Sequence, residues 1–144
     1  MPRNIELKAR LRDPAAARAV AERLCPGAPQ VERQIDTYFD SRRGRLKLRE
    51  IAGRGAWLIC YERPNRIEAK ASDYLLVPVT DPAGLKSALS EALGIRGIVT
   101  KLRHIYLFQN VRIHLDEVEG IGHFLEFEAV LADGAICIWL PPAT

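Results

Sequence analysis

Residues 4–12 read NIELKARLR, and their side chains alternate strictly between two chemical types. In an extended chain, one face would carry the apolar residues Ile5, Leu7, Ala9 and Leu11. The opposite face would carry the polar and charged residues Glu6, Lys8, Arg10 and Arg12. Because successive side chains of a strand point to opposite sides, this period of two predicts a β-strand with one densely charged face.

Similar charged faces recur in four later segments of the chain. They carry Arg45/Lys47/Arg49, Lys101/Arg103, Arg112/His114/Asp116 and Glu126/Glu128. In a single strand such a face simply meets water. Five such faces are harder to explain in this way, because neighbouring like charges repel unless an opposite charge offsets them. If the faces turn inward in a closed sheet, the lumen would hold about eight cations and three or four carboxylates, which suits a polyphosphate with a divalent metal.

The remaining pattern predicts eight strands and two helices. The strands are expected at 4–12, 34–40, 44–50, 56–63, 70–79, 100–109, 111–118 and 123–131. One helix should cover 14–24 and the other should run from Pro82 to Gly94, since each follows an Asp-Pro pair that combines an N-cap with a first-turn proline. We therefore expect a mainly β (α+β) fold, an eight-stranded antiparallel closed β-barrel with two or more flanking helices.

Composition limits the class of protein. The chain has 144 residues, 48% of them hydrophobic, and a net charge of +3, so we expect a single domain over 1–144, with an atypical or truncated segment at 132–144. Residues 1–72 carry +7 and residues 73–144 carry −4, which suggests a polyanion site supplied mainly by the first half. Cys25, Cys60 and Cys137 have no zinc-type spacing and favour reduced thiols. The lack of a signal peptide or long apolar run favours a cytoplasmic protein without a membrane partner.

At this point the residues resemble the CYTH, or triphosphate tunnel, enzyme family. Asn4–Lys8 resembles the ExExK signature, and GRLKLRE at 44–50 resembles the basic strand. The segments YERP at 61–64 and KASDY at 70–74 resemble the middle strands, and RIHLDEVEGIGHFLEFE at 112–128 resembles the metal-binding segment. Each pattern is short, but together, in this order, they cover most of the chain.

The resemblance implies a charged tunnel that binds a triphosphate with Mg²⁺ or Mn²⁺. The implied metal ligands are Glu6, Asp116, Glu126 and Glu128. The implied triphosphate-binding residues are Lys8, Arg45, Lys47, Arg49, Arg63, Lys70, Lys101, Arg103 and Arg112. Of these, Lys8, Arg49, Lys70 and Arg112 are expected to be catalytic. Asn4 replaces the first signature glutamate, so we expect weaker binding of metal, above all of a second ion.

The resemblance leaves the reaction open. Class IV adenylate cyclase activity, which converts ATP to cyclic AMP and pyrophosphate, is favoured by the segment 70–74. The alternative is hydrolysis of the terminal phosphate of tripolyphosphate or thiamine triphosphate. A third reading, from a different class, is a non-catalytic module that binds nucleotide or polyphosphate. Either enzyme would be metal-dependent, and the resemblance also suggests a homodimer.

Other candidate sites carry less weight. His114 and His123 lack zinc spacing and are expected to be structural. Tyr38, Tyr61, Tyr74 and Tyr106 fit packing in strands better than contact with a base. No P-loop or Rossmann glycine motif occurs. With a net charge of only +3 and interleaved carboxylates, the chain is not expected to bind nucleic acid.

Overall fold

The computed structural model describes residues 3–62 and 70–131. Its elements follow in the order β1 (Arg3–Arg10), α1 (Pro14–Leu24), β2 (Gln30–Phe39), β3 (Arg45–Ile51), β4 (Gly55–Tyr61), β5 (Lys70–Val79), α2 (Pro82–Leu93), β6 (Ile95–Phe108), β7 (Val111–Val118) and β8 (Gly122–Leu131). The predicted mainly β fold with eight antiparallel strands and two helices is confirmed. Arg63, Cys137 and the segment 132–144 lie outside the described residues, as does the side chain of Lys70.

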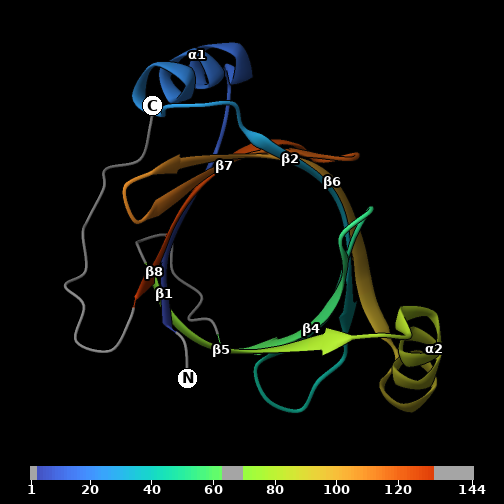
Figure 1. Ribbon diagram of the computed structural model, residues 1–144. Helices are drawn as coiled ribbons and strands as arrows, with labels where there is room; N and C mark the ends of the chain where they lie inside the picture. Colours follow the sequence, from blue (N-terminus) through green and yellow to red (C-terminus); the bar gives the residue numbers. More distant parts are fainter. Residues whose placement is uncertain (1–2, 63–69, 132–144) are drawn as a thin grey trace.

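The sheet curls into a barrel. Its strands follow the order β1-β5-β4-β3-β2-β6-β7-β8, and β8 pairs with β1 (Figure 1). The seam between β1 and β5 is short, because only Arg3–Glu6 pair with Lys70–Asp73. Since β5 begins at Lys70, no described residue of β5 lies opposite Leu7–Arg10. The expectation of a fully closed barrel is therefore corrected. In the described part of the chain, β1 and β5 pair over four residues each, and the sheet is open beyond these pairs.

Two strands begin earlier than the sequence predicted. β2 starts at Gln30 rather than 34, and β6 starts at Ile95 rather than 100. The added residues of β6 pair with the last residues of β2, from Asp36 to Phe39. Long-range pairing therefore extends both strands into segments whose local hydropathy pattern is weak.

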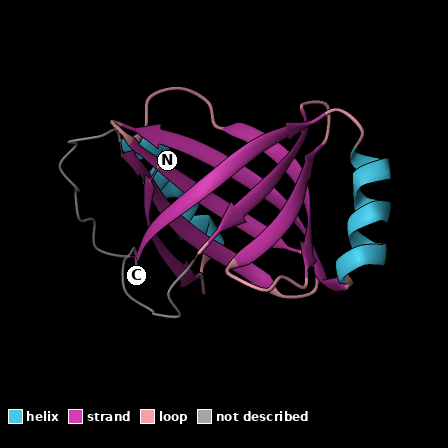
Figure 2. Cartoon of the chain, turned by 90° about the horizontal axis from the view of Figure 1, so that it is seen from below, coloured by secondary structure: helices cyan, strands magenta, loops and turns pink. Residues whose placement is uncertain are grey.

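Each helix is started by the expected aspartate and packs on the outside of the barrel (Figures 1 and 2). Asp13 accepts a hydrogen bond from the Ala16 backbone N–H at 3.1 Å, and Asp81 accepts one from Gly84 at 3.0 Å. Helix α1 buries Ala21 against an outer-wall cluster of β6, β7 and β8, which includes Tyr106, Ile113, Leu115 and Leu125. Helix α2 packs on a second cluster, Phe39, Leu48 and Ala56.

The interior of the barrel is polar as a consequence. Many apolar residues of the strands point outward, under the helices, so the polar residues that alternate with them point inward. The buried polar and charged residues of the inward faces are Glu32, Gln34, Asp36, Lys101, Arg103, His114, Asp116 and Glu126. Thr37 is also buried, but it lies on the outer face, opposite Leu48 of the cluster under α2. Because burying charge is costly unless it is compensated, this set marks the lumen as the place to look for function.

Neither helix in the described part of the chain has the length and hydropathy needed to cross a bilayer.

Candidate functional site

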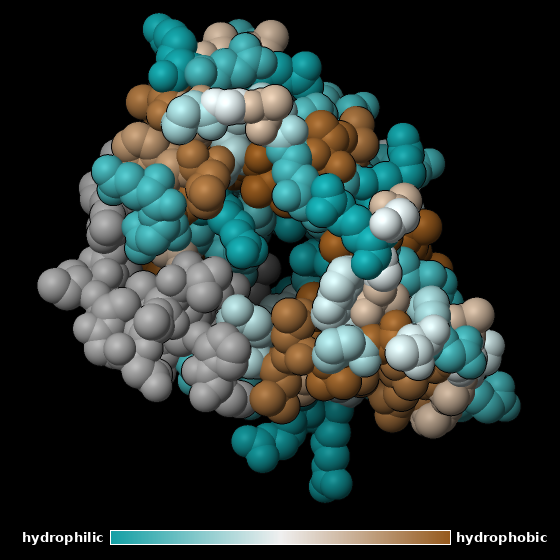
Figure 3. All heavy atoms as spheres, viewed as in Figure 1, coloured by the Kyte–Doolittle hydropathy of each residue, from teal (hydrophilic) through white to brown (hydrophobic). Residues whose placement is uncertain are grey.

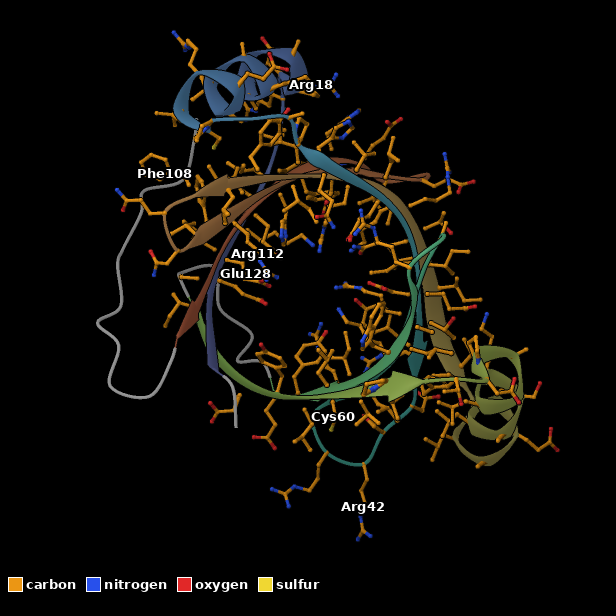
Figure 4. All side chains as sticks on the ribbon, in the orientation of Figure 1. Arg18, Arg42, Cys60, Phe108, Arg112 and Glu128 are labelled. Carbon is orange, nitrogen blue, oxygen red and sulfur yellow. The ribbon has the colours of Figure 1, made fainter. Side chains whose placement is uncertain are left out.

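The lumen forms a cavity of about 750 Å³. Among the described residues, six cationic side chains line it: Lys8, Lys47, Arg49, Lys101, Arg103 and Arg112. Four carboxylates also line it: Glu6, Glu32, Glu126 and Glu128. Figure 4 shows the charged side chains of many strands pointing toward the axis of the barrel. The charged faces predicted from alternation therefore turn inward.

Three carboxylates gather on the adjoining strands β1 and β8. Glu6 is directly opposite Glu128 in the ladder, and Glu126 follows two positions away. Oxygen atoms of Glu6, Glu126 and Glu128 lie within 4.8 Å of one another. Oxygen ligands around one octahedral Mg²⁺ ion are separated by about 3–4 Å, since each lies about 2.1 Å from the metal. The donor type and the spacing of this carboxylate cluster therefore fit a hard divalent cation such as Mg²⁺ or Mn²⁺.

His114 orients one member of the carboxylate cluster. Its Nδ1 lies 3.0 Å from Oε1 of Glu126, and both side chains are buried. Burial by itself would raise the pKa of Glu126, but the hydrogen bond from His114 and the charge of Arg103 hold it well below its usual range. The ionised carboxylate can only accept, so Nδ1–H is the donor. Glu126 is thus kept charged and fixed in place.

Asp116 lies apart from the carboxylate cluster, although the resemblance implied that it is a metal ligand. Its two oxygens accept hydrogen bonds from Nε and Nη2 of Arg103 at 2.7 and 2.8 Å, and only 2% of Asp116 is exposed. Burial raises the pKa of Asp116, but the Arg103 hydrogen bonds lower it more. This bidentate pair fixes the Arg103 guanidinium, which leaves its remaining donors to face the lumen.

A second charged cluster is centred on Asp36, which the sequence did not single out. Asp36 is fully buried and accepts two hydrogen bonds from Arg49, both at 2.8 Å. Lys47 and Lys101 bring their ammonium groups to 3.7 and 3.6 Å from the same carboxylate. One anion therefore faces three cations. Burial raises the pKa of Asp36, but the hydrogen bonds and charge of Arg49 lower it more, so it is held far below the usual range.

The two lysines of this Asp36 cluster have weakened basicity. Burial, followed by the charge of Arg49, lowers the pKa of Lys47 to about 7. Burial, followed by the charge of Arg103, lowers the pKa of Lys101 to about 8. The Lys47 ammonium also lies over the rings of Tyr38 and Tyr61, at 5.6 and 5.2 Å from the centroids. The Asp36 cluster thus carries excess positive charge that an anionic ligand would stabilise.

The other predicted cations occupy different positions. Lys8 lines the cavity and lies over the Phe124 ring at 5.4 Å. Arg112 lies 3.6 Å from Glu128 of the carboxylate cluster. Figure 4 labels the two side chains next to each other on the inner side of the barrel wall. Arg45 is exposed at the start of β3 and does not line the cavity. Lys70 is opposite Glu6 in the ladder, and only its backbone is described.

Part of the lumen was not foreseen from the sequence. On β2, Glu32 accepts hydrogen bonds from the side-chain amides of Gln30 at 2.8 Å and Gln34 at 2.7 Å. Asp36 continues the same face, and the alternation of QIDTYFD was the signal that could have shown it. The cavity also has an apolar side, formed by Ile51, Trp57, Ile59 and Leu76, which the strand patterns did not indicate.

A comparison with known proteins finds a relative of similar sequence. A protein of Methanocaldococcus jannaschii, provisionally named an adenylate cyclase, is 26% identical over 102 residues. The match covers 69% of this chain and 57% of that protein, so this chain spans little more than half the length of that relative.

Solved structures share the fold. The PH1012 protein of Pyrococcus horikoshii matches with a TM-score of 0.78 and 26% identity, over 90% of this chain and 79% of that one. A Hippeastrum protein matches with a TM-score of 0.66 and 20% identity, over 91% of this chain and 80% of that one. It is provisionally named an adenylyl cyclase, and its structure was described as revealing a dominant triphosphatase activity. The family model for the CYTH domain matches residues 2–139. The chain therefore belongs to the CYTH domain family.

Proposed function

We propose that this protein is a divalent-metal-dependent enzyme that acts on a triphosphate bound in the barrel lumen. The observation that carries the proposal is that a carboxylate cluster with metal-ligand spacing shares one cavity with six cationic side chains. Membership of the CYTH family supports the same substrate class. These six cations line the lumen of the barrel, which favours a small substrate over nucleic acid at this site.

The residues of the chain would bind and orient the triphosphate. Arg49 and Arg103 are held rigidly by Asp36 and Asp116, so their guanidinium groups are preorganised for phosphate oxygens. Lys8, Lys47 and Lys101 would add point charges along the phosphate chain. Because these groups come from opposite walls of the barrel, they can fix the phosphate chain in one orientation.

Glu6, Glu126 and Glu128 would hold the metal, with His114 orienting Glu126. A bound divalent cation would offset phosphate charge and stabilise the charge that develops during phosphoryl or nucleotidyl transfer. The cation would also separate the negative charges of these carboxylates from those of the triphosphate. We therefore expect metal and triphosphate to bind in a mutually dependent way.

The reaction we favour is that of an adenylate cyclase. In that reaction the ribose 3′ oxygen forms a bond to the α-phosphorus of ATP, the bond from the α-phosphorus to its bridging oxygen breaks, and pyrophosphate leaves. The hydroxyl proton is released. The provisional name of the Methanocaldococcus jannaschii relative supports this choice.

Hydrolysis of a terminal phosphate is the second candidate. There, water forms a bond to the terminal phosphorus, the bond from that phosphorus to its bridging oxygen breaks, and orthophosphate and the corresponding diphosphate are released. ATP, tripolyphosphate or thiamine triphosphate would be the substrate. The activity described for the Hippeastrum structural neighbour favours it. The same cavity would serve either reaction, because the two differ in which nucleophile is placed in line with which phosphorus.

The test identifies products. The protein is incubated with Mg²⁺ or Mn²⁺ and, separately, ATP, tripolyphosphate and thiamine triphosphate, and every phosphorus-containing product is assigned by ³¹P NMR. Cyclic AMP with pyrophosphate would establish the cyclase, and orthophosphate would establish a phosphohydrolase. Binding without turnover would contradict the enzyme proposal and leave a binding module.

The matched variants are Glu126→Gln and Glu117→Gln. The amide introduced by Glu126→Gln keeps an oxygen that can accept from His114, so the fold should survive while metal binding fails. Glu117 is an exposed residue on the neighbouring strand β7 that does not line the cavity. Turnover should be lost in the first variant and kept in the second. Equal turnover in both would contradict the assigned site.

A further inference from the structure

His114 uses only one of its two ring nitrogens within the protein. Nδ1 lies 3.0 Å from Oε1 of Glu126, and no described residue forms a hydrogen bond with Nε2. A fully buried Nε2 would be one of the buried polar atoms that lack a hydrogen bond, and in the described chain those atoms belong to other residues. Because His114 lines the cavity, its Nε2 faces the open part of the lumen. Figure 3 shows this lumen as an opening in the molecule, partly bordered by hydrophilic residues in teal.

The contact with Glu126 decides the chemistry of Nε2. The ionised carboxylate can only accept, so the proton of the neutral imidazole is on Nδ1. Nε2 then carries a lone pair that points away from Glu126, because the two ring nitrogens face in different directions. In catalytic dyads a carboxylate fixes the tautomer of a histidine in this way, and the other ring nitrogen accepts a hydrogen bond from the nucleophile.

Other acceptors of the lumen are already engaged. Glu32 accepts from two side-chain amides, and Asp36 and Asp116 each accept two hydrogen bonds from an arginine. The members of the carboxylate cluster are assigned to the metal. A carboxylate is also a poor neighbour for a phosphate, because the two negative charges repel each other. A neutral imidazole accepts a hydrogen bond without that repulsion, so Nε2 of His114 can lie beside a phosphate.

His114 lies where metal and phosphate would meet. It is two positions from Arg112 on the inward face of β7, and it is opposite Glu126 in the β7–β8 ladder. Nη2 of Arg103 comes within 3.8 Å of the same Glu126 oxygen that Nδ1 of His114 contacts. Two cations and one metal ligand therefore surround this ring. A nucleophile that is hydrogen-bonded to Nε2 would be close to a phosphate held by Arg103 or Arg112.

We propose that Nε2 of His114 accepts a hydrogen bond from the attacking hydroxyl or water and holds its oxygen in line with the phosphorus. His114 is then a catalytic residue as well as a partner of Glu126. This inference rests on the proposed function, because it assigns the group that places the nucleophile of that reaction. It applies to either candidate reaction, since a ribose hydroxyl and a water molecule both carry an O–H donor.

Two substitutions separate the roles of the two nitrogens. The amide nitrogen introduced by His114→Asn lies as many bonds from Cα as Nδ1 does, so it can donate to Glu126, and nothing takes the place of Nε2. The amide introduced by His114→Gln lies as many bonds from Cα as Nε2 does, so its oxygen can accept from the nucleophile while the donor to Glu126 is lost. The matched control is His104→Asn on the neighbouring strand β6, because His104 does not line the cavity.

The test measures turnover and binding separately. Each protein is assayed with Mn²⁺ and either ATP or tripolyphosphate. Electron paramagnetic resonance measures Mn²⁺ affinity, and calorimetry measures the affinity for an inorganic triphosphate analogue in which methylene groups replace both bridging oxygens.

His114→Asn should lower kcat about 100-fold or more, with KM and both affinities within about threefold of the wild-type values. His114→Gln should bind Mn²⁺ about tenfold more weakly, yet at saturating Mn²⁺ it should keep more turnover than His114→Asn. His104→Asn should change none of these quantities.

The outcomes separate this inference from the proposed function. If the kcat of His114→Asn stays within about fivefold of the wild-type value, the inference is wrong and the proposed function stands. The same holds if the affinity of His114→Asn for Mn²⁺ or for the analogue falls as much as kcat does, because His114 would then serve binding only. If the wild-type protein forms no product from either substrate, the proposed function fails and the inference fails with it.

Discussion

The two charged clusters of the lumen are compensated in opposite ways. In the Asp36 cluster, one carboxylate faces Arg49, Lys47 and Lys101, so cations are in excess. In the carboxylate cluster, the three anions Glu6, Glu126 and Glu128 lie together, and Arg103, Arg112 and His114 contact two of them. The first cluster is held together by its own ion pairs, whereas the second would be completed by a metal. A residue of the same type can therefore serve stability in one cluster and ligand binding in the other.

The largest loss of stability should come from removing the carboxylate of the Asp36 cluster. Asp36→Asn leaves Arg49 and Lys101 buried without their counter-ion, and breaking a buried pair costs about 3–5 kcal/mol. We expect the free energy of unfolding in urea to fall by about that amount. Asp40→Asn, at an exposed position at the end of the same strand, should change it by less than about 0.5 kcal/mol. Equal effects of the two variants would contradict the central role of Asp36.

A substitution in the carboxylate cluster should change metal binding much more than the stability of the metal-free protein. Glu128→Gln removes one of three neighbouring negative charges, so the stability of the metal-free protein should change by less than about 1 kcal/mol. The gain in melting temperature that Mn²⁺ gives the wild-type protein should be lost, because ligand binding stabilises only the state that binds. Thermal denaturation with and without Mn²⁺ measures both. A large loss of metal-free stability would mean that this cluster is structural.

The pH dependence of triphosphate binding follows from the lysines of the Asp36 cluster. The pKa of Lys47 is lowered to about 7 and that of Lys101 to about 8, mainly by burial. Triphosphate favours their protonated forms, so affinity should fall as pH rises from about 7 to 9 and binding should take up protons there. Calorimetry in buffers with different ionisation enthalpies measures this uptake. Lys47→Arg, which stays charged, should reduce it.

The stability of the ligand-free protein should follow the opposite trend. Between pH 7 and the ordinary lysine value of 10.5, the unfolded chain binds more protons at Lys47 than the folded chain does. Unfolding therefore becomes less favourable as pH rises through this window. Urea denaturation at pH 7 and 9 should show a more stable protein at pH 9. A fall in stability that Lys47→Arg abolishes would contradict the lowered pKa.

The smallest effect is expected at a surface pair. Arg43 and Glu62 lie 3.8 Å apart, with side chains 86% and 72% exposed. Exposed pairs of this kind contribute little because water and salt screen them. Arg43→Ala should shift the urea midpoint by no more than experimental error. A loss comparable with that of Asp36→Asn would show that burial is not what distinguishes the two pairs.

The sequence predicted which strand faces carry charge, but not which charges meet. Alternation placed Lys47, Arg49, Arg103 and Glu126 on inward faces, and the fold confirms that orientation. Asp116 shares the inward face of β7, yet it lies opposite Arg103 in the β6–β7 ladder and forms a bidentate pair with it. Register between strands depends on long-range pairing, which local periodicity does not contain.

Two further features needed the tertiary structure. Asp36 in QIDTYFD looks like an ordinary solvent-facing carboxylate until pairing places Arg49 on one side and β6 on the other. In β4, the run AWLICY is apolar on both faces, so alternation does not reveal that Trp57 and Ile59 face the lumen. The sequence therefore could not place in the lumen a charged residue that looks solvent-exposed, or apolar residues that look like part of a hydrophobic core.

The most direct test of the account is metal binding by the carboxylate cluster. Electron paramagnetic resonance counts the Mn²⁺ ions bound when Mn²⁺ is titrated into the wild-type, Glu126→Gln and Glu117→Gln proteins. Each protein is measured with an inorganic triphosphate analogue in which methylene groups replace both bridging oxygens, so that it cannot be cleaved. We predict Mn²⁺ binding in the wild-type and Glu117→Gln proteins, and a loss of at least tenfold in affinity for Glu126→Gln. Mn²⁺ binding of equal strength in all three proteins would contradict the assignment of the metal, and with it the proposed site.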